Sequence, residues 1–329
     1  MSNFQAPLLN IRNLKVVFPS EMGVVRAVEG IDLAVHPGEC AAIVGESGCG
    51  KSVTSLAIMR LLNSPPALIQ ADEMTFDGHD LLAMEENSLC ELRGRDMCMI
   101  FQDALTALNP VMTVGRQMDE IFLRHEKMSK KEAKAASIEA LRLVGVPSPE
   151  RRYHDYPHQL SGGMRQRVLI AMAFAVKPKL IIADEPTTAL DVTIQAQVLD
   201  LLKKLQKEHG TALILITHDL SVVAHMADTV HVMYSGKIVE EAPLRQLFKT
   251  PAHPYTQGLL ASVPKLDQCT TRFVQIPDQV PNPMHKPSGC YFHPRCSHCT
   301  KECQESMPRL TEFEAGRKIR CHHPQKEGQ

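Results

Sequence analysis

Short apolar runs separated by polar turns recur along the chain and predict alternating strands and helices. Residues 8–11 and 14–18 look like edge strands of an N-terminal antiparallel layer, joined by a turn at Arg12-Asn13. Residues 25–35 supply another strand pair. Continuous apolar runs of the kind that form parallel strands buried on both faces occupy residues 41–44, 180–183 and 212–216. The pattern therefore predicts an α/β fold that starts with an antiparallel β layer.

Helical signals replace the strand pattern between Leu81 and Tyr156. They predict a helical subdomain inserted at about residues 90–165. Within it, Ser129 and Glu132 have the spacing of a capping box, which marks the start of a helix. We expect this helix to be structural only.

Charge and chain composition narrow the functional classes. A formal net charge of −1 over 329 residues gives no overall basic field that would attract nucleic acid or anionic lipid. The longest uncharged apolar run, residues 168–176, is too short to span a bilayer. Residues 1–5 lack the basic and apolar regions of a signal peptide. We therefore expect a cytosolic protein that reaches a membrane only through a partner.

A glycine-rich loop follows the first buried strand and has the spacing of a Walker A loop. It reads Gly45-Glu46-Ser47-Gly48-Cys49-Gly50-Lys51-Ser52. Its backbone N–H groups can wrap a phosphate, and the helix that continues through Val53 points its N-terminus at the β- and γ-phosphates. Lys51 adds a positive charge, and the Ser52 hydroxyl is placed to ligate Mg²⁺. An ordinary glycine turn is the alternative, but the strand-loop-helix context favours a nucleotide site.

A second phosphate-binding helix start is predicted in the segment Leu160-Ser161-Gly162-Gly163-Met164-Arg165-Gln166, called the signature segment below. Ser161 and two glycines open an apolar helix there, and a helix N-terminus attracts anions. One chain therefore offers two places that can bind phosphate.

Polar side chains at the ends of apolar strands complete the set of candidate catalytic groups. Asp184 would hold Mg²⁺ through its water shell, and Glu185 can take a proton from a water that attacks the γ-phosphate. His218 follows the strand at 212–216, at the edge where open α/β sheets bind ligands, and can hydrogen-bond the γ-phosphate. Gln102 can reach Mg²⁺ or the attacking water, although taken alone such a glutamine is more typical of a surface.

The order and spacing of these motifs resemble those of an ABC ATPase over about residues 8–265. The chain is similar to the ATP-binding subunit of an ABC transporter, and the Ser-Gly-Gly signature is specific to that family. The resemblance implies a P-loop NTPase core in which two nucleotide domains meet head to tail. The signature segment of one domain then covers the γ-phosphate held by the Walker A loop of the other.

The resemblance also implies a role for each matching residue. ATP would be bound by Phe18, Gly45, Ser47, Gly48, Cys49, Gly50, Lys51, Ser52 and Val53, with Phe18 stacking on the adenine. Magnesium would be bound by Ser52, Gln102 and Asp184, and the catalytic residues would be Glu185 as general base, His218 as switch histidine and Gln102. The nucleotide of the partner would be contacted by Ser161, Gly162, Gly163 and Gln166, and Asp191 would lie at the dimer interface.

Some positions depart from these implied roles or leave them open. From the residues alone, Phe18 could equally be a core aromatic at a strand end. Cys49 stands where serine is more usual, and Ala104 where the family often has proline. Neither removes a ligand, because the loop binds phosphate through its backbone.

A narrower resemblance covers the end of the chain. His253-Pro254-Tyr255-Thr256 and the segment 289–296 look like the tail of subunits that serve dipeptide, oligopeptide and nickel importers. This implies an ATPase at the cytoplasmic face of the inner membrane that powers peptide uptake. Its partners would be a second ATPase subunit of different sequence, two membrane-spanning permease subunits and a periplasmic binding protein, with no nucleic acid.

Other functions stay open at this stage. Import of nickel or another small solute belongs to the same branch. A soluble ABC ATPase that acts on DNA or ribosomes is disfavoured, because the chain has neither a long coiled-coil insert nor a second nucleotide domain. A non-catalytic regulatory subunit is disfavoured by the complete set of catalytic residues.

The last predicted domain, residues 266–329, is rich in Pro, His and Cys and follows a nucleotide-binding domain at residues 1–265. Such a segment cannot fold by hydrophobic burial alone, so we expect a metal or a cross-link. Thiolates suit Zn²⁺ or an iron-sulfur cluster, free thiols are a third possibility, and spacing alone does not choose among them. The resemblance favours a 4Fe-4S cluster on Cys290, Cys296, Cys303 and Cys321. Cys299 could compete as a ligand.

Overall fold

The chain passes back and forth between two structural units. The computed structural model describes residues 6–188, 190–262, 276–277 and 279–325. Unit 1 comprises residues 1–35, 40–82 and 216–329, and unit 2 comprises residues 36–39 and 83–215. The boundary expected between residues 265 and 266 stays a prediction.

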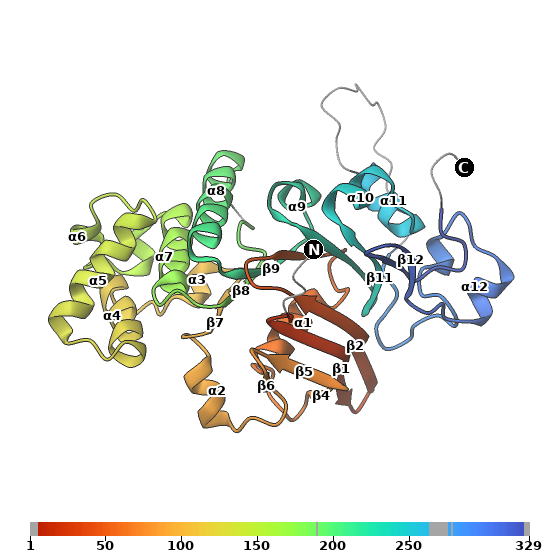
Figure 1. The fold of residues 1–329 in the computed structure, drawn as a ribbon, viewed down its shortest axis with the longest axis horizontal. Helices are drawn as coiled ribbons and strands as arrows, with labels where there is room; N and C mark the ends of the chain where they lie inside the picture. The colour runs from red at the N-terminus through yellow and green to blue at the C-terminus, as the bar shows by residue number, and fades with distance from the viewer. Residues whose placement is uncertain (1–5, 189, 263–275, 278, 326–329) are drawn as a thin grey trace. The chain divides into compact units, whose positions relative to one another are not determined.

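An antiparallel sheet of five strands forms one layer of unit 1 (Figure 1). Its strands are β1 (Leu9–Ser20), β2 (Gly23–Val35), β4 (Leu68–Gln70), β5 (Glu73–Phe76) and β6 (His79–Asp80). They follow the order β2-β1-β5-β6, and β4 also pairs with β1. The side chains of β1 alternate between the two faces on either side of residues 12–13, and the buried ones are Leu9, Ile11, Leu14 and Val16.

Strand β1 is one bulged strand, so the expectation of two strands joined by a turn at Arg12-Asn13 is wrong. β1 pairs with β2 on both sides of this dipeptide, and the register shifts between Ile11 and Leu14. Because a bulge inserts an extra residue, these two side chains, three residues apart, both reach the buried face. Asn13 has a positive φ of 54°, which asparagine tolerates better than most residues. The pair expected at residues 25–35 is likewise one strand.

A second group of strands in unit 1 includes the strand that precedes the Walker A loop. It contains β3 (Cys40–Val44), β10 (Thr229–Tyr234), β11 (Lys237–Pro243), β13 (Arg317–Ile319) and β12 (Thr311–Glu314), in that spatial order. β10 is parallel to β3, and the other neighbouring pairs are antiparallel. The cysteine-rich end of the chain thus adds its own strands to this sheet.

Short helices complete unit 1. They are α1 (Lys51–Ile58), α9 (Leu220–Met226), α10 (Leu244–Lys249), α11 (Pro254–Ala261), the 3-10 helix η2 (His293–Arg295) and α12 (Lys301–Glu305). Helix α1 starts at Lys51, directly after the last glycine of the Walker A loop, so the predicted helix that follows the glycines is confirmed.

Unit 2 is mostly helical. Its helices are α2 (Glu86–Leu92), α3 (Ala104–Ala107), α4 (Val114–His125), α5 (Lys130–Leu143), α6 (Pro149–Arg152), the 3-10 helix η1 (Pro157–Gln159), α7 (Gly162–Phe174) and α8 (Val192–His209). Parallel strands β7 (Met97–Ile100) and β8 (Leu180–Asp184) lie side by side, and β9 (Ala212–Thr217) leads back into unit 1. The capping box predicted at Ser129 and Glu132 is confirmed, with both reciprocal hydrogen bonds present.

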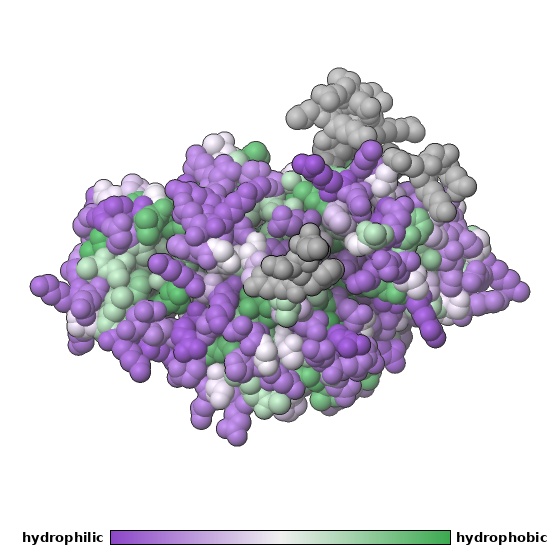
Figure 2. Space-filling view, viewed as in Figure 1, coloured by the Kyte–Doolittle hydropathy of each residue, from purple (hydrophilic) through white to green (hydrophobic). Residues whose placement is uncertain are grey.

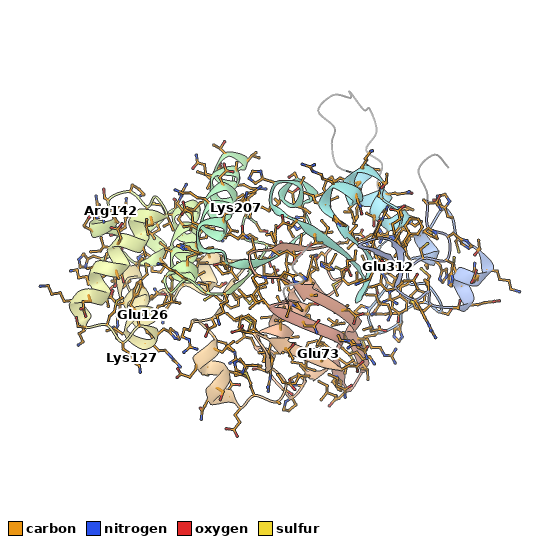
Figure 3. All side chains as sticks on the ribbon, in the orientation of Figure 1. Glu73, Glu126, Lys127, Arg142, Lys207 and Glu312 are labelled. Atoms are coloured by element: carbon orange, nitrogen blue, oxygen red, sulfur yellow. The ribbon has the colours of Figure 1, made fainter. Side chains whose placement is uncertain are left out.

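The surface is largely hydrophilic, with some apolar side chains exposed over the helices of unit 2 (Figure 2). Charged side chains such as Arg142, Lys207 and Glu312 are exposed, and Figure 3 labels where they lie. Within the described ranges, the helices are all too short or too polar to serve as a membrane span.

Candidate active site

The Walker A loop joins β3 to α1 in unit 1. Two of its glycines pack closely against the backbone of neighbouring strands. A Cβ on Gly45 would lie 2.1 Å from the carbonyl oxygen of Met233. A Cβ on Gly50, whose φ is +108°, would lie 2.5 Å from the carbonyl oxygen of Ala27. Since neither backbone atom can move like a side-chain end, only glycine fits at these positions.

Lys51 lies inside the arch of this loop. Its Nζ donates hydrogen bonds to the carbonyl oxygens of Gly45 at 2.8 Å and Glu46 at 3.0 Å. The side chain is nearly buried, whereas Ser52, in the first turn of α1, is exposed. The ammonium group is therefore held against the backbone of a glycine-rich loop, and a cation beside such a loop suits the binding of a phosphate.

Cys49 fits the loop as a neutral group. It is 1% exposed, and burial raises the pKa of its thiol although Lys51 opposes this rise. Its carbonyl oxygen accepts a 2.8 Å hydrogen bond from the N–H of Gly236, in the turn between β10 and β11. Cysteine in place of serine thus adds no negative charge beside a bound phosphate.

In unit 2, the strand ends bring Glu185 and Gln102 together. Gln102 Nε2 donates a 2.8 Å hydrogen bond to Glu185 Oε2, and Thr188 Oγ1 donates another at 2.9 Å to the same oxygen. Asp184, the last residue of β8, is 5% exposed. Glu185 has a positive φ of 46°, a strained conformation that clusters at functional sites. The carboxylate is therefore held in one orientation by its neighbours.

The signature segment starts helix α7 in unit 2 as predicted. Ser161 is the N-cap, and its Oγ accepts a 3.3 Å hydrogen bond from the N–H of Met164. Gly163 lies so close to α8 that a Cβ there would be 2.6 Å from Ile194 Cγ2. Gln166 is buried, and its Nε2 has no hydrogen-bond partner among the described residues. Asp191 is exposed and caps α8.

The remaining predicted residues lie in unit 1. His218 is exposed and follows directly after β9. Phe18 is half-buried in β1, opposite Val25 of β2. Both positions are compatible with the roles that the sequence assigns to them, and those roles stay predictions.

The cysteine-rich end brings together the predicted cluster ligands. Cys290, Cys296, Cys303 and Cys321 line one small cavity of about 10 Å³ in unit 1, together with several histidines. Burial raises the pKa of Cys290 to about 11 and that of Cys321 to about 12. Cys299 does not line this cavity, and its Sγ instead accepts a 3.8 Å hydrogen bond from Gln304. In the described part of the chain, no three His, Cys, Asp or Glu side chains are close enough together for a single metal ion.

Two contacts of the site were missed from the sequence. Thr188, which holds Glu185, sits in a Thr187-Thr188 pair whose hydroxyls offered only a weak signal. Arg295, 249 positions after Glu46, forms an ion pair with that loop residue. No local pattern connects residues so far apart in the sequence.

Comparisons with family profiles identify two regions of the chain. The profile of the family described as "ABC transporter" matches residues 28–188. The profile described as "Oligopeptide/dipeptide transporter, C-terminal region" matches residues 239–303. The first match includes the Walker A loop, the signature segment and Glu185, and the second includes three of the four predicted cluster cysteines.

Relatives match over nearly the full chain. The oligopeptide transport ATP-binding protein AppD of Bacillus subtilis (strain 168) is 47% identical over 98% of this chain and 98% of its own length. The dipeptide transport ATP-binding protein DppD of Haemophilus influenzae is 49% identical over 96% of both chains. The DppD protein of Escherichia coli (strain K12) is 47% identical over 96% of this chain and 97% of its own.

Solved structures share the fold. A dimeric post-hydrolysis state of the ATP-binding cassette MJ0796, bound to ADP and Pi, has a TM-score of 0.64 at 27% identity. The match covers 72% of this chain and 99% of that one. The cbiO1 protein of Clostridium perfringens, part of the cbiONQ ABC transporter complex, has a TM-score of 0.61 at 27% identity, covering 74% and 91%. The P-loop fold of an ABC ATPase, with its antiparallel β layer, is therefore confirmed.

Proposed function

The chain belongs to the family of ATP-binding subunits of oligopeptide and dipeptide ABC importers, and we propose that it powers the uptake of di- or oligopeptides across the inner membrane. It is an ABC ATPase that couples ATP hydrolysis to transport. The observation that carries the peptide cargo is the near full-length match to peptide transport proteins, including their C-terminal region. Nickel or another small solute is the alternative cargo.

ATP binding is assigned to unit 1. The backbone N–H groups of the Walker A loop and the Lys51 ammonium contact the phosphates, and Phe18 stacks on the adenine.

Magnesium binding is assigned to Ser52, Gln102 and Asp184. Their hydroxyl, amide and carboxylate oxygens suit Mg²⁺, a hard cation that prefers oxygen ligands. When bound, Mg²⁺ neutralises charge on the β- and γ-phosphates.

Hydrolysis is assigned to Glu185 as the general base. Gln102 and Thr188 both donate to its Oε2, which holds the carboxylate in place to accept a proton from the attacking water. Lys51 and His218 stabilise negative charge that develops on the γ-phosphate. This role of His218 is supported by its exposure at the carboxyl end of β9.

The partner nucleotide is assigned to the signature segment. Ser161, Gly162 and Gly163 present a capped helix N-terminus at the surface. This helix end suits the γ-phosphate of an ATP molecule bound to a second ATPase subunit. Gln166 supports this end of α7 from its buried position, and Asp191 lies at the dimer interface. That second subunit is a different chain of the same family.

The membrane partners are two permease subunits that receive peptide from a periplasmic binding protein, and the chain sits peripherally on the cytoplasmic face. An exposed apolar segment around Gln102 supports the permease contact. Phe101 is 40% exposed, Leu105 47% and Val111 79%. Large exposed apolar side chains that lie close together in the sequence suit a contact with another protein.

The cysteine-rich domain, residues 266–329, is assigned a 4Fe-4S cluster that cross-links it, after a nucleotide-binding domain at residues 1–265. Support comes from the shared cavity of Cys290, Cys296, Cys303 and Cys321, since four thiolates are the usual ligands of such a cluster. Anaerobic purification with iron and sulfide analysis is expected to give about four of each per chain. A colourless protein with one zinc would overturn the assignment.

Uptake by cells tests the cargo directly. Cells with the intact chain are expected to accumulate labelled di- and oligopeptides, and cells with Lys51→Ala are expected to lose this uptake because the phosphates lose their cation. Accumulation of nickel, but not of peptides, that depends on Lys51 would replace the peptide cargo by the alternative. Purification of the chain without any integral membrane protein would contradict the transport role itself.

A further inference from the structure

The cysteine-rich end of the chain holds the Walker A loop through one ion pair within unit 1. Arg295 Nη1 lies 2.7 Å from Glu46 Oε2, and Nη2 lies 3.0 Å from Glu46 Oε1. Each of the two terminal guanidinium nitrogens thus contacts one carboxylate oxygen, which is the strongest geometry for such a pair. The Arg295 side chain is 2% exposed and the Glu46 side chain 30%.

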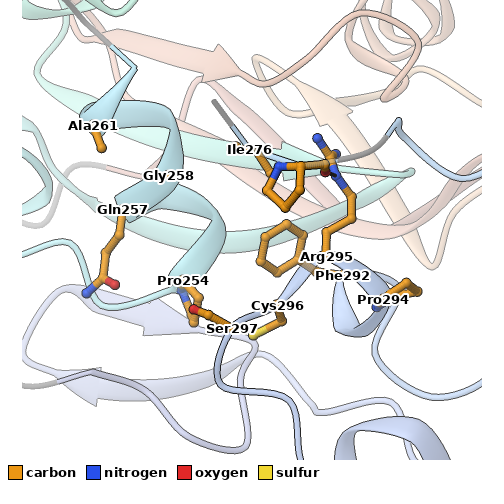
Figure 4. A pocket seen from close by; sticks show the side chains of 11 residues that line it. Pro254, Gln257, Gly258, Ala261, Ile276, Phe292, Pro294, Arg295, Cys296 and Ser297 are labelled. Atoms are coloured by element: carbon orange, nitrogen blue, oxygen red, sulfur yellow. Dashed lines mark hydrogen bonds between the residues drawn. The ribbon is translucent and has the colours of Figure 1, made fainter. Parts of the chain in front are cut away.

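Arg295 is fixed from its other sides as well. Its Nε donates a 2.7 Å hydrogen bond to the carbonyl oxygen of Pro277, and its guanidinium lies over the Tyr234 ring. Figure 4 shows Arg295 beside Phe292 and Ile276 on the wall of a pocket next to α11. The arginine therefore has little freedom to follow Glu46 if the loop moves.

Glu46 is held through its backbone too. Its N–H donates a 2.9 Å hydrogen bond to the Tyr255 hydroxyl, and its carbonyl oxygen accepts one of 3.0 Å from Lys51 Nζ. Hydrogen bonds thus hold both the side chain and the backbone of Glu46. The position of Glu46 in turn sets the path of the loop that surrounds the phosphate.

Charge gives the pair a second effect. A carboxylate in a phosphate-binding loop repels a triphosphate unless a cation neutralises it, and a partly buried site screens this repulsion less than water does. Arg295 supplies that cation. Because Arg295 directly precedes Cys296, one of the residues that line the cysteine cavity, its position also depends on how the cysteine-rich end is folded.

We propose that Arg295 is a positioning residue for ATP binding, which acts by neutralising the Glu46 carboxylate and so makes the affinity for ATP depend on the folded cysteine-rich end. The inference rests on the proposed binding of ATP by the Walker A loop. It does not depend on which metal the cysteines bind.

Binding of a fluorescent ATP analogue with Mg²⁺ to the full chain tests this role. Arg295→Met is expected to raise the dissociation constant about tenfold, the scale of one lost charged hydrogen bond. Glu46→Gln alone is expected to change it by less than about threefold. The double variant Arg295→Met with Glu46→Gln is expected to regain affinity to within about threefold of the unchanged protein, because the unpaired carboxylate is gone.

The double variant separates charge from simple loss of packing. The single variant Arg295→Met and the double variant lose the same arginine contacts, so their melting temperatures are expected to fall alike. Only the single variant is expected to bind ATP poorly. Lys318→Met, which breaks the exposed ion pair to Glu241, is the matched control and is expected to leave affinity unchanged. If Arg295→Met does not fold, Arg295→Lys keeps the charge but loses the paired geometry, with an expected loss of about threefold.

Two results would overturn the inference. One is an unchanged dissociation constant in folded Arg295→Met or Arg295→Lys. The other is a double variant that binds as weakly as Arg295→Met alone. If the unchanged protein itself fails to bind the analogue, the assignment of the Walker A loop is at fault instead.

Discussion

Gln102 Nε2 donates a 2.8 Å hydrogen bond to Glu185 Oε2, so a residue of the segment proposed to contact the permease also holds the proposed general base. The two residues follow the ends of neighbouring parallel strands, β7 and β8. Movement of the segment that contains Gln102 would therefore reorient the carboxylate. This contact gives a direct physical route from a permease contact to the rate of hydrolysis.

Glu185→Gln is expected to bind ATP normally and to hydrolyse it at least about 100-fold more slowly, because an amide cannot act as a general base. Steady-state turnover and nucleotide binding measure the two effects separately. Glu208→Gln, on an exposed face of α8, is the control and is expected to keep full activity. Undiminished turnover in Glu185→Gln would remove this residue from the role of base.

Gln102→Leu is expected to lower kcat about tenfold, since one hydrogen bond to a charged group is lost. The comparison variant is Gln197→Leu, which loses a 3.2 Å hydrogen bond from Arg167 away from the strand ends. A kinetic comparison in the assembled complex measures the effect. Equal kcat values for the two variants would show that Gln102 does not position Glu185.

Ser161→Ala and Ser129→Ala each remove a helix N-cap, Ser161 from α7 and Ser129 from α5. Each is expected to lower the free energy of unfolding by about 1 kcal/mol, measured by urea denaturation. Only Ser161→Ala is expected to lower ATP turnover with the partner subunit, because only it removes a contact to the partner nucleotide. Parallel losses of turnover would mean that Ser161 acts through stability alone.

Gly50→Ala is expected to abolish binding of ATP, because the added Cβ would lie 2.5 Å from the carbonyl oxygen of Ala27 and distort the loop. Gly78→Ala is the matched control: its φ is also positive, at +80°, but a Cβ there meets no atom within 4 Å. It is expected to lose only about 1 kcal/mol of stability and no affinity. Titration with the fluorescent analogue compares the two, and normal binding by Gly50→Ala would contradict the loop geometry.

Arg317→Met is expected to destabilise unit 1 by about 3–5 kcal/mol, because it leaves the buried Glu240 carboxylate without its cation, with only the backbone N–H groups of Ala252 and His253 as donors. The side chains of this ion pair are 2% and 0% exposed, and Arg317 Nη2 lies 2.8 Å from Glu240 Oε1. Lys318→Met, on the same strand but in an exposed pair, is expected to cost less than about 1 kcal/mol. Denaturant unfolding measures both, and equal costs would show that β13 is not anchored by the buried pair.

Local patterns were sufficient for much of the site. The Walker A loop between a buried strand and α1, the capping box of Ser129 and Glu132, and the Ser161 cap of α7 are all as the sequence predicts. Each depends on atoms only a few residues apart, so residue type and spacing are enough to specify it.

Long-range contacts decided the rest. Arg12-Asn13 looked like a turn, but pairing with β2 on both sides makes it a bulge in one strand. Arg295 reaches Glu46 across 249 positions. Hydrophobic periodicity records which face of an element is buried, not which distant segment covers it. Sequence alone therefore determined the phosphate loop and the local helix starts. The ion pair of Arg295 with Glu46 and the shared cysteine cavity exist only because tertiary packing brings distant segments together.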